Sequence, residues 1–333
     1  MYWIQFLISA VFIVLAGIRL TDYADKLSEQ SNIGKAWIGI ILLGLVTSLP
    51  EAIVSLTSVI SLKANNMAIG NLLGSNNFNP MLIVVMDIFY RKGSITNDIG
   101  TNKSHDISGS FAIILTLVVV GEILLGMHGF IFRVASLSYG SILIAVLYFA
   151  GMRSLSSIDS GRSQYSEKDP IKAQDCTISA FKIWINLVLS AVVVVVAAMW
   201  LAQSADVIAD KTGLGRTFVG SIFLAIVTSL PEMVVSLSAL RLGSFDMAIG
   251  NIFGSNMTNL FVVPICDIFY KGAILSSVNS VHILTASVSI ILVVIACLGI
   301  KIKHKRTVLG LGWDSILMLL IFTIGNIFLY RMR

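Results

Sequence analysis

The sequence predicts an all-α integral membrane protein with ten transmembrane helices, arranged as two inverted-topology repeats of five helices. Three observations predict this fold. Hydrophobic residues make up 56% of the 333 residues and charged residues only 12%, which is about half of the roughly 25% charged residues typical of soluble domains. Ten apolar stretches are long enough to cross a bilayer, which takes about 20 residues. Two long motifs of the first half also recur in the second half.

The ten apolar stretches divide into two sets of five. They cover residues 2–20, 37–62, 67–90, 108–126 and 131–150, and then residues 179–202, 217–241, 246–270, 279–300 and 311–330. The first stretch predicts a spanning helix and not a cleavable signal, because no lysine or arginine precedes it. We therefore expect a first five-helix repeat over 1–150, a linker over 151–178 and a second, inverted repeat over 179–333.

The basic residues indicate which side of the membrane the loops face. With the N-terminus outside, most of the 23 lysines and arginines fall in loops on the inner side, which is the asymmetry typical of cytoplasmic loops. We expect a multi-pass protein of the cell membrane, with both termini outside and a cytoplasmic linker at 151–178. The net charge of +5 does not indicate a nucleic-acid partner, because the basic residues are scattered in short loops.

The two halves share motifs that include polar residues. Residues 34–51 (GKAWIGIILLGLVTSLPE) align with residues 215–232 (GRTFVGSIFLAIVTSLPE), and residues 67–80 (MAIGNLLGSNNFNP) align with residues 247–260 (MAIGNIFGSNMTNL). Chance similarity between apolar helices would not repeat Pro, Glu, Asn and Ser at matching positions. Because each half has an odd number of spans, the second copy must enter the membrane from the opposite side, as in many secondary transporters.

Glu51 and Glu232 lie near the middle of apolar spans. A charged side chain at the bilayer centre costs about 2.5–3.5 kcal/mol on insertion scales, and no lysine or arginine lies at a comparable depth. Metal cations or bound protons are the remaining partners. A proline precedes each glutamate and removes a helical backbone donor, so we expect free carbonyl groups around 44–47 and 225–228 to face the same ions. A packing kink alone would explain the prolines but not the acids.

Other polar residues repeat at helical spacing near the glutamates. They are Thr47, Ser48 and Ser55, with Thr228 and Ser236 in the second half, and Asn71, Ser75 and Asn79, with Asn251, Ser255 and Asn259 in the second half. Carboxylate, carbonyl, hydroxyl and amide oxygens without Cys or His favour a hard cation such as Ca²⁺ or Na⁺. Hydrogen bonding between helices explains the hydroxyls equally well. Each half also carries a G-x-x-x-G pair for close packing, Gly70 with Gly74 and Gly250 with Gly254.

These motifs resemble the paired repeats of the sodium/calcium exchangers, of the prokaryotic type, in the calcium:cation antiporter superfamily. TSLPE with GNLLGSNNFN and TSLPE with GNIFGSNMTN carry the resemblance, which covers most of the chain. It implies an antiporter, and not an enzyme, that exchanges Ca²⁺ for Na⁺ by alternating access. It implies no prosthetic group, only transported Ca²⁺ and Na⁺ (or H⁺). The expected partners are these ions and the lipid bilayer, with no obligate protein partner.

The resemblance also implies which residues bind the ions. The matching side chains are Thr47, Ser48, Glu51, Ser75 and Asn79 in the first half and Thr228, Ser229, Glu232, Ser255 and Asn259 in the second, with backbone carbonyls near Gly44 and Ala225. The two glutamates would be shared by Ca²⁺ and Na⁺, so that binding of one ion excludes the other.

One position departs from the family pattern. Many sodium-coupled members have an aspartate where this chain has Asn259, so the site carries at most two negative charges and balances one Ca²⁺, two Na⁺ or two H⁺. Exchange of Ca²⁺ for H⁺ by the same glutamates is therefore the alternative to exchange for Na⁺. A cation channel is less expected, because this chain carries its own inverted pair. An intramembrane protease is also less expected, because the sequence has no intramembrane Asp pair or His-based metal motif.

Overall fold

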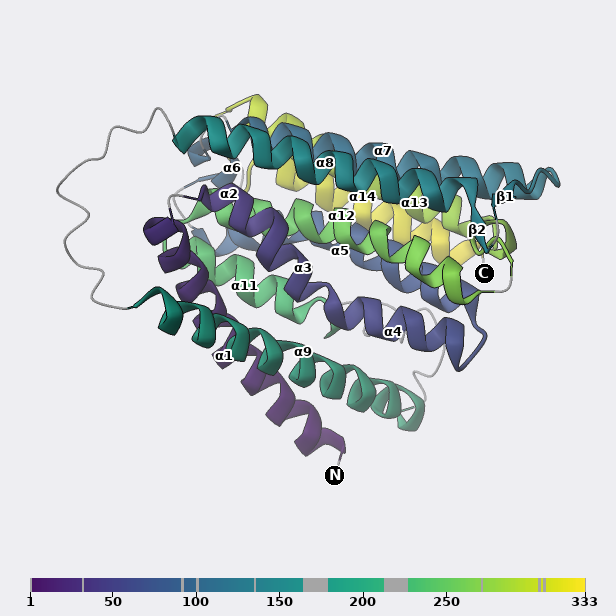
Figure 1. Ribbon diagram of the computed structural model, residues 1–333, viewed down its shortest axis with the longest axis horizontal. Coiled ribbons are helices and arrows are strands. Elements are labelled where there is room, and N and C mark those ends of the chain that lie inside the picture. The colour runs from purple at the N-terminus through teal and green to yellow at the C-terminus, as the bar shows by residue number, and fades with distance from the viewer. Residues whose placement is uncertain are drawn as a thin grey trace.

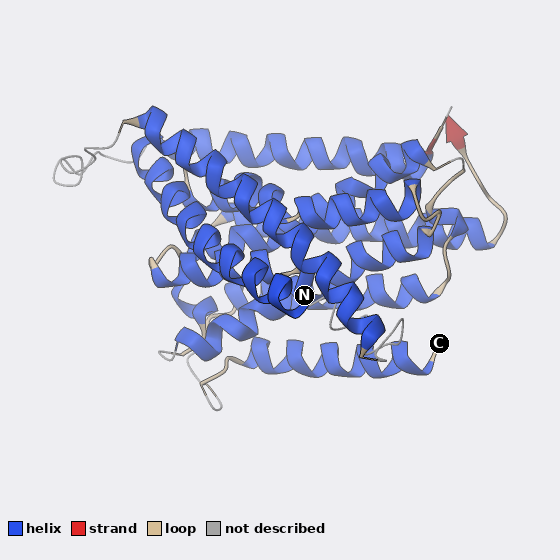
Figure 2. Cartoon of the chain, turned by 90° about the horizontal axis from the view of Figure 1, so that it is seen from below, coloured by secondary structure: helices blue, strands red, loops and turns tan. Residues whose placement is uncertain are grey.

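The protein is a bundle of helices that run roughly along its longest dimension (Figures 1 and 2). The computed structural model describes residues 2–31, 33–90, 93–99, 102–134, 136–163, 179–212, 227–270, 272–304, 307 and 310–332. Eight helical segments among these residues are long and apolar enough to cross a membrane. The all-α membrane fold predicted from the sequence is confirmed.

Helical elements occupy all ten predicted spans, although the seventh is described only from residue 227 onward. The first half contains α1 (Tyr2–Ser31), α2 (Lys35–Trp37), a π-helix (Ile38–Leu43), α3 (Gly44–Thr47), α4 (Leu49–Ile60), α5 (Asn65–Tyr90), α6 (Ile95–Asp98), α7 (Lys103–Met127), β1 (Arg133–Val134), β2 (Leu137–Ser138) and α8 (Tyr139–Ser163). The second half contains α9 (Ala180–Lys211), α11 (Leu230–Arg241), α12 (Phe245–Phe269), a 3₁₀ turn (Leu275–Ser277), α13 (Val281–Lys301) and α14 (Trp313–Arg331).

The fifth span begins later than predicted. The short antiparallel pair of β1 and β2 occupies the start of the predicted range 131–150, and α8 begins only after it. The Ser138 hydroxyl accepts a hydrogen bond from the Ser141 N–H at 3.1 Å, which satisfies a free donor at the start of the helix. At its other end α8 runs to Ser163, into the stretch predicted as linker, and residues 164–178 lie outside the described residues.

Two contacts show that equivalent helices of the two halves run antiparallel. The Lys211 ammonium, at the end of α9, lies 4.3 Å from the centroid of the Tyr2 ring at the start of α1. Tyr90, at the end of α5, packs edge-on against Phe245 at the start of α12, with ring centroids 5.5 Å apart. In Figure 1, α1 and α9 also run in opposite directions along the bundle. Antiparallel equivalents are what an inverted repeat requires.

Two buried aspartates join the halves in a reciprocal way. Asp87 of α5 accepts hydrogen bonds from the Gly312 N–H at 3.1 Å and the Ser315 hydroxyl at 2.8 Å, at the start of α14. Asp267 of α12 accepts one from the Ser138 N–H at 2.7 Å, at the start of α8. A carboxylate at a helix N-terminus is stabilised by the N–H groups and the helix dipole. The third span of each half therefore fixes the fifth span of the other half.

Glycines let the broken helix of the first half approach α12 closely. A Cβ atom at Gly254 would collide with the Ile40 carbonyl oxygen, and one at Gly44 would lie 2.7 Å from the Gly254 carbonyl carbon. A Cβ atom at Gly250 would lie 2.7 Å from the Ala36 carbonyl oxygen. The G-x-x-x-G pair of the second half therefore serves close packing, as predicted. This packing brings α12 against the helix that leads to Glu51.

The substitution Gly254→Ala is expected to destabilise the protein. The new methyl group has no room beside the Ile40 carbonyl, and overpacking of this kind costs about 1–3 kcal/mol. We expect a lower midpoint of thermal unfolding in detergent. Gly121→Ala is the matched control, because a Cβ atom at Gly121 meets no described atom within 4 Å and alanine favours a helix by about 1 kcal/mol. Equal losses in both variants would contradict the packing argument.

Candidate ion-binding site

The two TSLPE segments break their helices in the middle of the span. The first break falls at Ser48 (φ −86°, ψ −2°), between α3 and α4, and the second at Ser229 (φ −86°, ψ 10°), just before α11. In each case the proline lies in the first turn of the new helix, where its missing N–H has no helical partner to lose. Glu51 and Glu232 follow it in the same turn. Both glutamates therefore lie at helix N-termini, where backbone N–H groups favour negative charge.

Both glutamates are fully buried and have no basic partner in the described chain. Glu51 and Glu232 are each 0% exposed, and their carboxylates lie close enough to repel one another. No lysine or arginine among the residues with described side chains is buried. None of the four carboxylate oxygens makes a hydrogen bond of good geometry with a described residue, although hydroxyl groups lie near both carboxylates. Burial of such charges is costly unless an opposite charge compensates them, so this pair requires cations or protons.

Four further oxygens of predicted ligand side chains have no hydrogen-bond partner among the described residues. They are the hydroxyls of Ser75 and Ser229 and the amide oxygens of Asn79 and Asn259. Ser75 lies beside Glu51 in the same half, whereas Thr47 and Ser48 of the first half lie beside Glu232 of the second. The oxygen atoms around the two carboxylates therefore come from both halves.

Hydroxyl groups of the first break also contact α12 directly. Thr47 Oγ1 donates to the Leu43 carbonyl at 3.0 Å and lies 3.2 Å from Asn251 Oδ1 and 3.1 Å from Ser255 Oγ. Ser255 Oγ donates to the Gly44 carbonyl at 3.4 Å. These contacts bring the predicted ligands Thr47, Ser255 and Gly44 together. Each hydroxyl oxygen keeps acceptor capacity, because a hydroxyl has two lone pairs.

The structure places the remaining predicted residues in the same region, with one exception. Thr228 and Ser229 are buried beside the second break. Ala225 lies outside the described residues, so the predicted carbonyl ligand near it stays a prediction.

Asn71 and Asn251, which share the predicted polar faces, hold the broken helices in place. The Asn71 amide donates to the Glu51 backbone carbonyl at 3.2 Å and to the Ser55 hydroxyl at 3.0 Å. Asn251 makes the same two contacts with the equivalent residues of α11, at 3.3 and 3.0 Å. These bonds attach each glutamate-bearing helix to the helix that follows it. The serine hydroxyls in these contacts are thus engaged in helix–helix hydrogen bonds.

Asn76 and Asn256 belong to the same region, but helical spacing did not predict them as site residues. Both are buried where α5 meets α12, and their amides bond across the boundary between the two halves. The repeated letters GSN at 74–76 and 254–256 were a signal for them. They lie off the helix faces that the spacing predicts, so their partners could be identified only from the structure.

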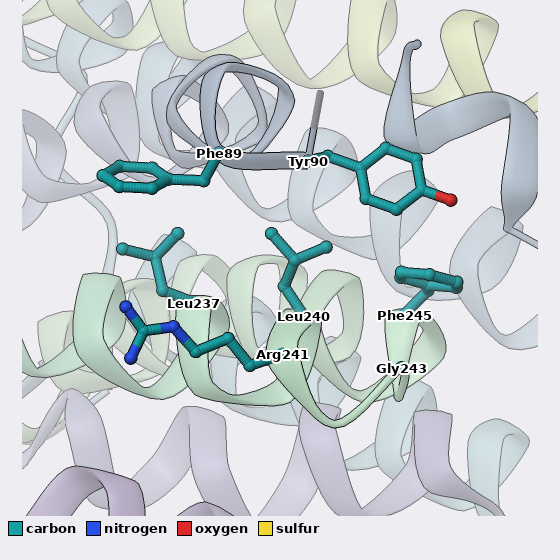
Figure 3. Close-up of a pocket in the computed structure, with 7 residues that line it drawn as sticks. All are labelled: Phe89, Tyr90, Leu237, Leu240, Arg241, Gly243 and Phe245. Atoms are coloured by element: carbon teal, nitrogen blue, oxygen red, sulfur yellow. The ribbon is translucent and has the colours of Figure 1, made fainter. Parts of the chain in front are cut away.

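A cavity of about 330 Å³ opens near the ends of α5 and α11, and none of the predicted ligand residues lines it. Figure 3 shows Phe89 and Tyr90 of α5 opposite Leu237 and Leu240 of α11 across this space. The charged residue in its lining is Arg241, which would repel a cation. This cavity is therefore not the ion site.

Comparison with known proteins agrees with this geometry. A family model described as sodium/calcium exchanger protein matches residues 1–153 and 182–331. This chain belongs to that family. The exchanger-family chain is 25% identical over 258 residues to inner membrane protein YrbG of Escherichia coli (strain K12), which covers 77% of this chain and 76% of YrbG.

A further relative and a solved structure are also similar to this chain. The sodium/calcium exchanger MaX1 of Methanosarcina acetivorans is 30% identical over 140 residues, covering 41% of this chain and 37% of MaX1. A solved structure of the sodium-calcium exchanger NCX_Mj superimposes with a TM-score of 0.71 at 20% identity, covering 97% of both chains. The protein is thus a multi-pass integral membrane protein of an antiporter family with the exchanger fold.

Proposed function

We propose that this protein is a secondary antiporter that moves Ca²⁺ across the cell membrane in exchange for Na⁺ by alternating access. The observation that supports it best is the pair of buried carboxylates, Glu51 and Glu232, with no buried basic residue in the described chain to neutralise them. Oxygen ligands without sulfur or imidazole suit Ca²⁺ and Na⁺. Membership of the sodium/calcium exchanger family favours Na⁺ over H⁺ as the coupling ion.

The proposed site is centred on the two glutamates, and its proposed ligands come from both halves. They are the side chains of Thr47, Ser48, Glu51, Ser75 and Asn79, those of Thr228, Ser229, Glu232, Ser255 and Asn259, and the carbonyls near Gly44 and Ala225. Two carboxylates balance one Ca²⁺ or two Na⁺. Because both ions need the same charges, one ion must leave before the other binds, and this competition couples the two fluxes. Because the proposed ligands come from both halves, a relative movement of the halves can expose the proposed site to either side in turn.

We also propose that both termini lie outside the cell and that the linker is cytoplasmic. The excess of lysine and arginine in the loops of one side supports this orientation. In Figure 1 the C-terminal end of α8 and the N-terminal end of α9 lie at the same end of the bundle as α6, and Arg91, Lys92 and Lys103 are close to α6 in the sequence.

The proposed function is tested by flux measurements in reconstituted vesicles. Vesicles loaded with Na⁺ and diluted into Na⁺-free medium should accumulate radioactive Ca²⁺, and uptake should saturate with external Ca²⁺. Vesicles loaded with K⁺ and vesicles without protein serve as controls. A pH gradient in the absence of Na⁺ should drive no uptake. Uptake driven by the pH gradient alone would contradict Na⁺ coupling, and uptake that needs no counter-ion would indicate a channel.

A further inference from the structure

Four asparagines form a reciprocal network where α5 crosses α12. The Asn76 amide donates to the Asn256 backbone carbonyl at 3.2 Å, and the Asn256 amide donates to the Asn76 backbone carbonyl at 3.4 Å. The Asn79 amide donates to Asn256 Oδ1 at 2.9 Å, and the Asn259 amide donates to Asn76 Oδ1 at 3.0 Å. Paired contacts of this kind are typical of a two-fold relation between the partners.

The network determines which way each amide points. A backbone carbonyl can only accept a hydrogen bond, so the NH₂ group of Asn256 must face the Asn76 carbonyl. The Oδ1 atom of Asn256 then faces Asn79, which must present its own NH₂ group. This leaves Asn79 Oδ1 on the other side of its amide, buried and without a described donor. The equivalent bonds, with the halves exchanged, leave Asn259 Oδ1 without a donor among the described residues.

Pro80 affects which donors can reach the Asn76 backbone carbonyl, one of the acceptors in this network. Pro80 lies four residues after Asn76 within α5, and because proline has no N–H, the Asn76 carbonyl has no helical donor. That carbonyl accepts instead from the Asn256 amide and from the Ser289 hydroxyl, the latter at 3.3 Å. Leu260, which has an N–H, stands at the equivalent position of the second half. Pro80 therefore leaves the Asn76 carbonyl without an N–H four residues on to compete with the Asn256 amide, whereas the Asn256 carbonyl accepts the Asn76 amide even though residue 260 is a leucine.

We propose that Asn76 and Asn256 are positioning residues: each turns the amide oxygen of the ion-ligand asparagine in the opposite half toward the transported ion. Asn256 orients Asn79, and Asn76 orients Asn259, while neither positioning residue contacts the ion. This inference rests on the proposed function, because it assigns a task at the same site. It also means that the ligands of each half are correctly oriented only when the two halves are in contact across α5 and α12.

Ca²⁺ binding to the purified full-length protein in detergent tests the proposal through double-mutant cycles. Asn256→Ala should weaken Ca²⁺ affinity about tenfold, because loss of a residue that orients a metal ligand costs roughly 10–100-fold. In an Asn79→Ala background the same substitution should have no further effect, since the oriented oxygen is already missing. Asn76→Ala should behave in the same way toward Asn259→Ala.

Pairs within one helix provide the matched control. Asn76→Ala with Asn79→Ala, and Asn256→Ala with Asn259→Ala, should have additive effects on affinity, because neither pair shares a hydrogen bond between side chains in the network. Additive effects in the crossed pairs, or equal coupling in crossed and same-helix pairs, would overturn the inference while leaving the proposed function standing. Absence of Ca²⁺ binding by the unaltered protein would overturn both.

Two further variants separate orientation from folding. If an alanine variant aggregates on size-exclusion chromatography, leucine, which fills a similar volume without an acceptor, takes its place with the same expected coupling. Asn256→Asp keeps an acceptor oxygen for the Asn79 amide and should bind Ca²⁺ more tightly than Asn256→Ala; this advantage should disappear in an Asn79→Ala background, where a gain from the added charge alone would remain. An Asp variant that binds no more tightly than the Ala variant would contradict the orienting role.

Discussion

Replacement of Glu51 or Glu232 by glutamine is expected to abolish Ca²⁺ uptake by reconstituted vesicles. Each substitution keeps the size of the side chain but lowers the charge of the site from −2 to −1, which no longer balances Ca²⁺. Both carboxylates are fully buried, and removal of one partner of a buried ion pair costs about 3–5 kcal/mol. That cost corresponds to a loss of affinity of roughly a hundredfold to a thousandfold or more. The initial rate of Na⁺-driven uptake of radioactive Ca²⁺ measures it.

Glu29→Gln is the matched control for these two variants. The chemical change is the same, but Glu29 lies near the end of α1 with its side chain 56% exposed, 3.7 Å from Lys35. Exposed ion pairs of this kind contribute only about 0–1 kcal/mol, so uptake should stay near that of the unaltered protein. Near-normal uptake in both Glu51→Gln and Glu232→Gln would rule out the site assignment.

The substitution Asn259→Asp is expected to make transport sensitive to membrane potential. In the unaltered protein, two carboxylates balance one Ca²⁺ or two Na⁺, so exchange should be electroneutral. A third carboxylate at 259 would raise the charge of the site to −3 and allow three Na⁺ to exchange for one Ca²⁺, which moves net charge. Asn76, whose Oδ1 now accepts from Asn259, would have to turn its NH₂ group toward the new carboxylate. The measurement is Ca²⁺ uptake at potentials set by K⁺ gradients with valinomycin.

Asn79→Asp provides the internal control for the charge argument. Asn79 occupies the equivalent position of the first half and has the same unpartnered amide oxygen among the described residues. If the number of charges determines stoichiometry, both variants should become sensitive to membrane potential. A strong dependence of the unaltered protein on potential would show that two charges do not limit exchange to two Na⁺.

Most of the fold could be predicted from the sequence, because a helix that crosses a bilayer needs about 20 mostly apolar residues in a row. Such stretches can be recognised in the sequence alone. The repeated motifs, with five spans in each half, also predicted that equivalent helices run antiparallel. The start of the fifth span could not be predicted. Residues 131–134 are apolar except for Arg133, yet a helix begins only where Ser138 caps it. That cap is held by Asp267, which lies far away in the sequence.

The candidate site could be predicted only in part. A carboxylate beside a proline in an apolar span is unusual enough to identify Glu51 and Glu232 directly. Helical spacing placed Asn71 and Asn79 on one face, but it could not show that the Asn71 amide bonds to the Glu51 backbone while Asn79 Oδ1 has no donor among the described residues. Such differences depend on contacts between helices. For the same reason Asn76, whose partners belong to the other half, was missed.

The central claim is that one cation is shared by a carboxylate from each half. Anomalous diffraction from crystals soaked in Ca²⁺ tests it most directly. We predict a peak between the two breaks, at the usual Ca²⁺–oxygen distance of about 2.3–2.6 Å from a carboxylate oxygen of Glu51 and from one of Glu232. A Ca²⁺ peak that contacts only one of the two glutamates, or neither, would contradict the account.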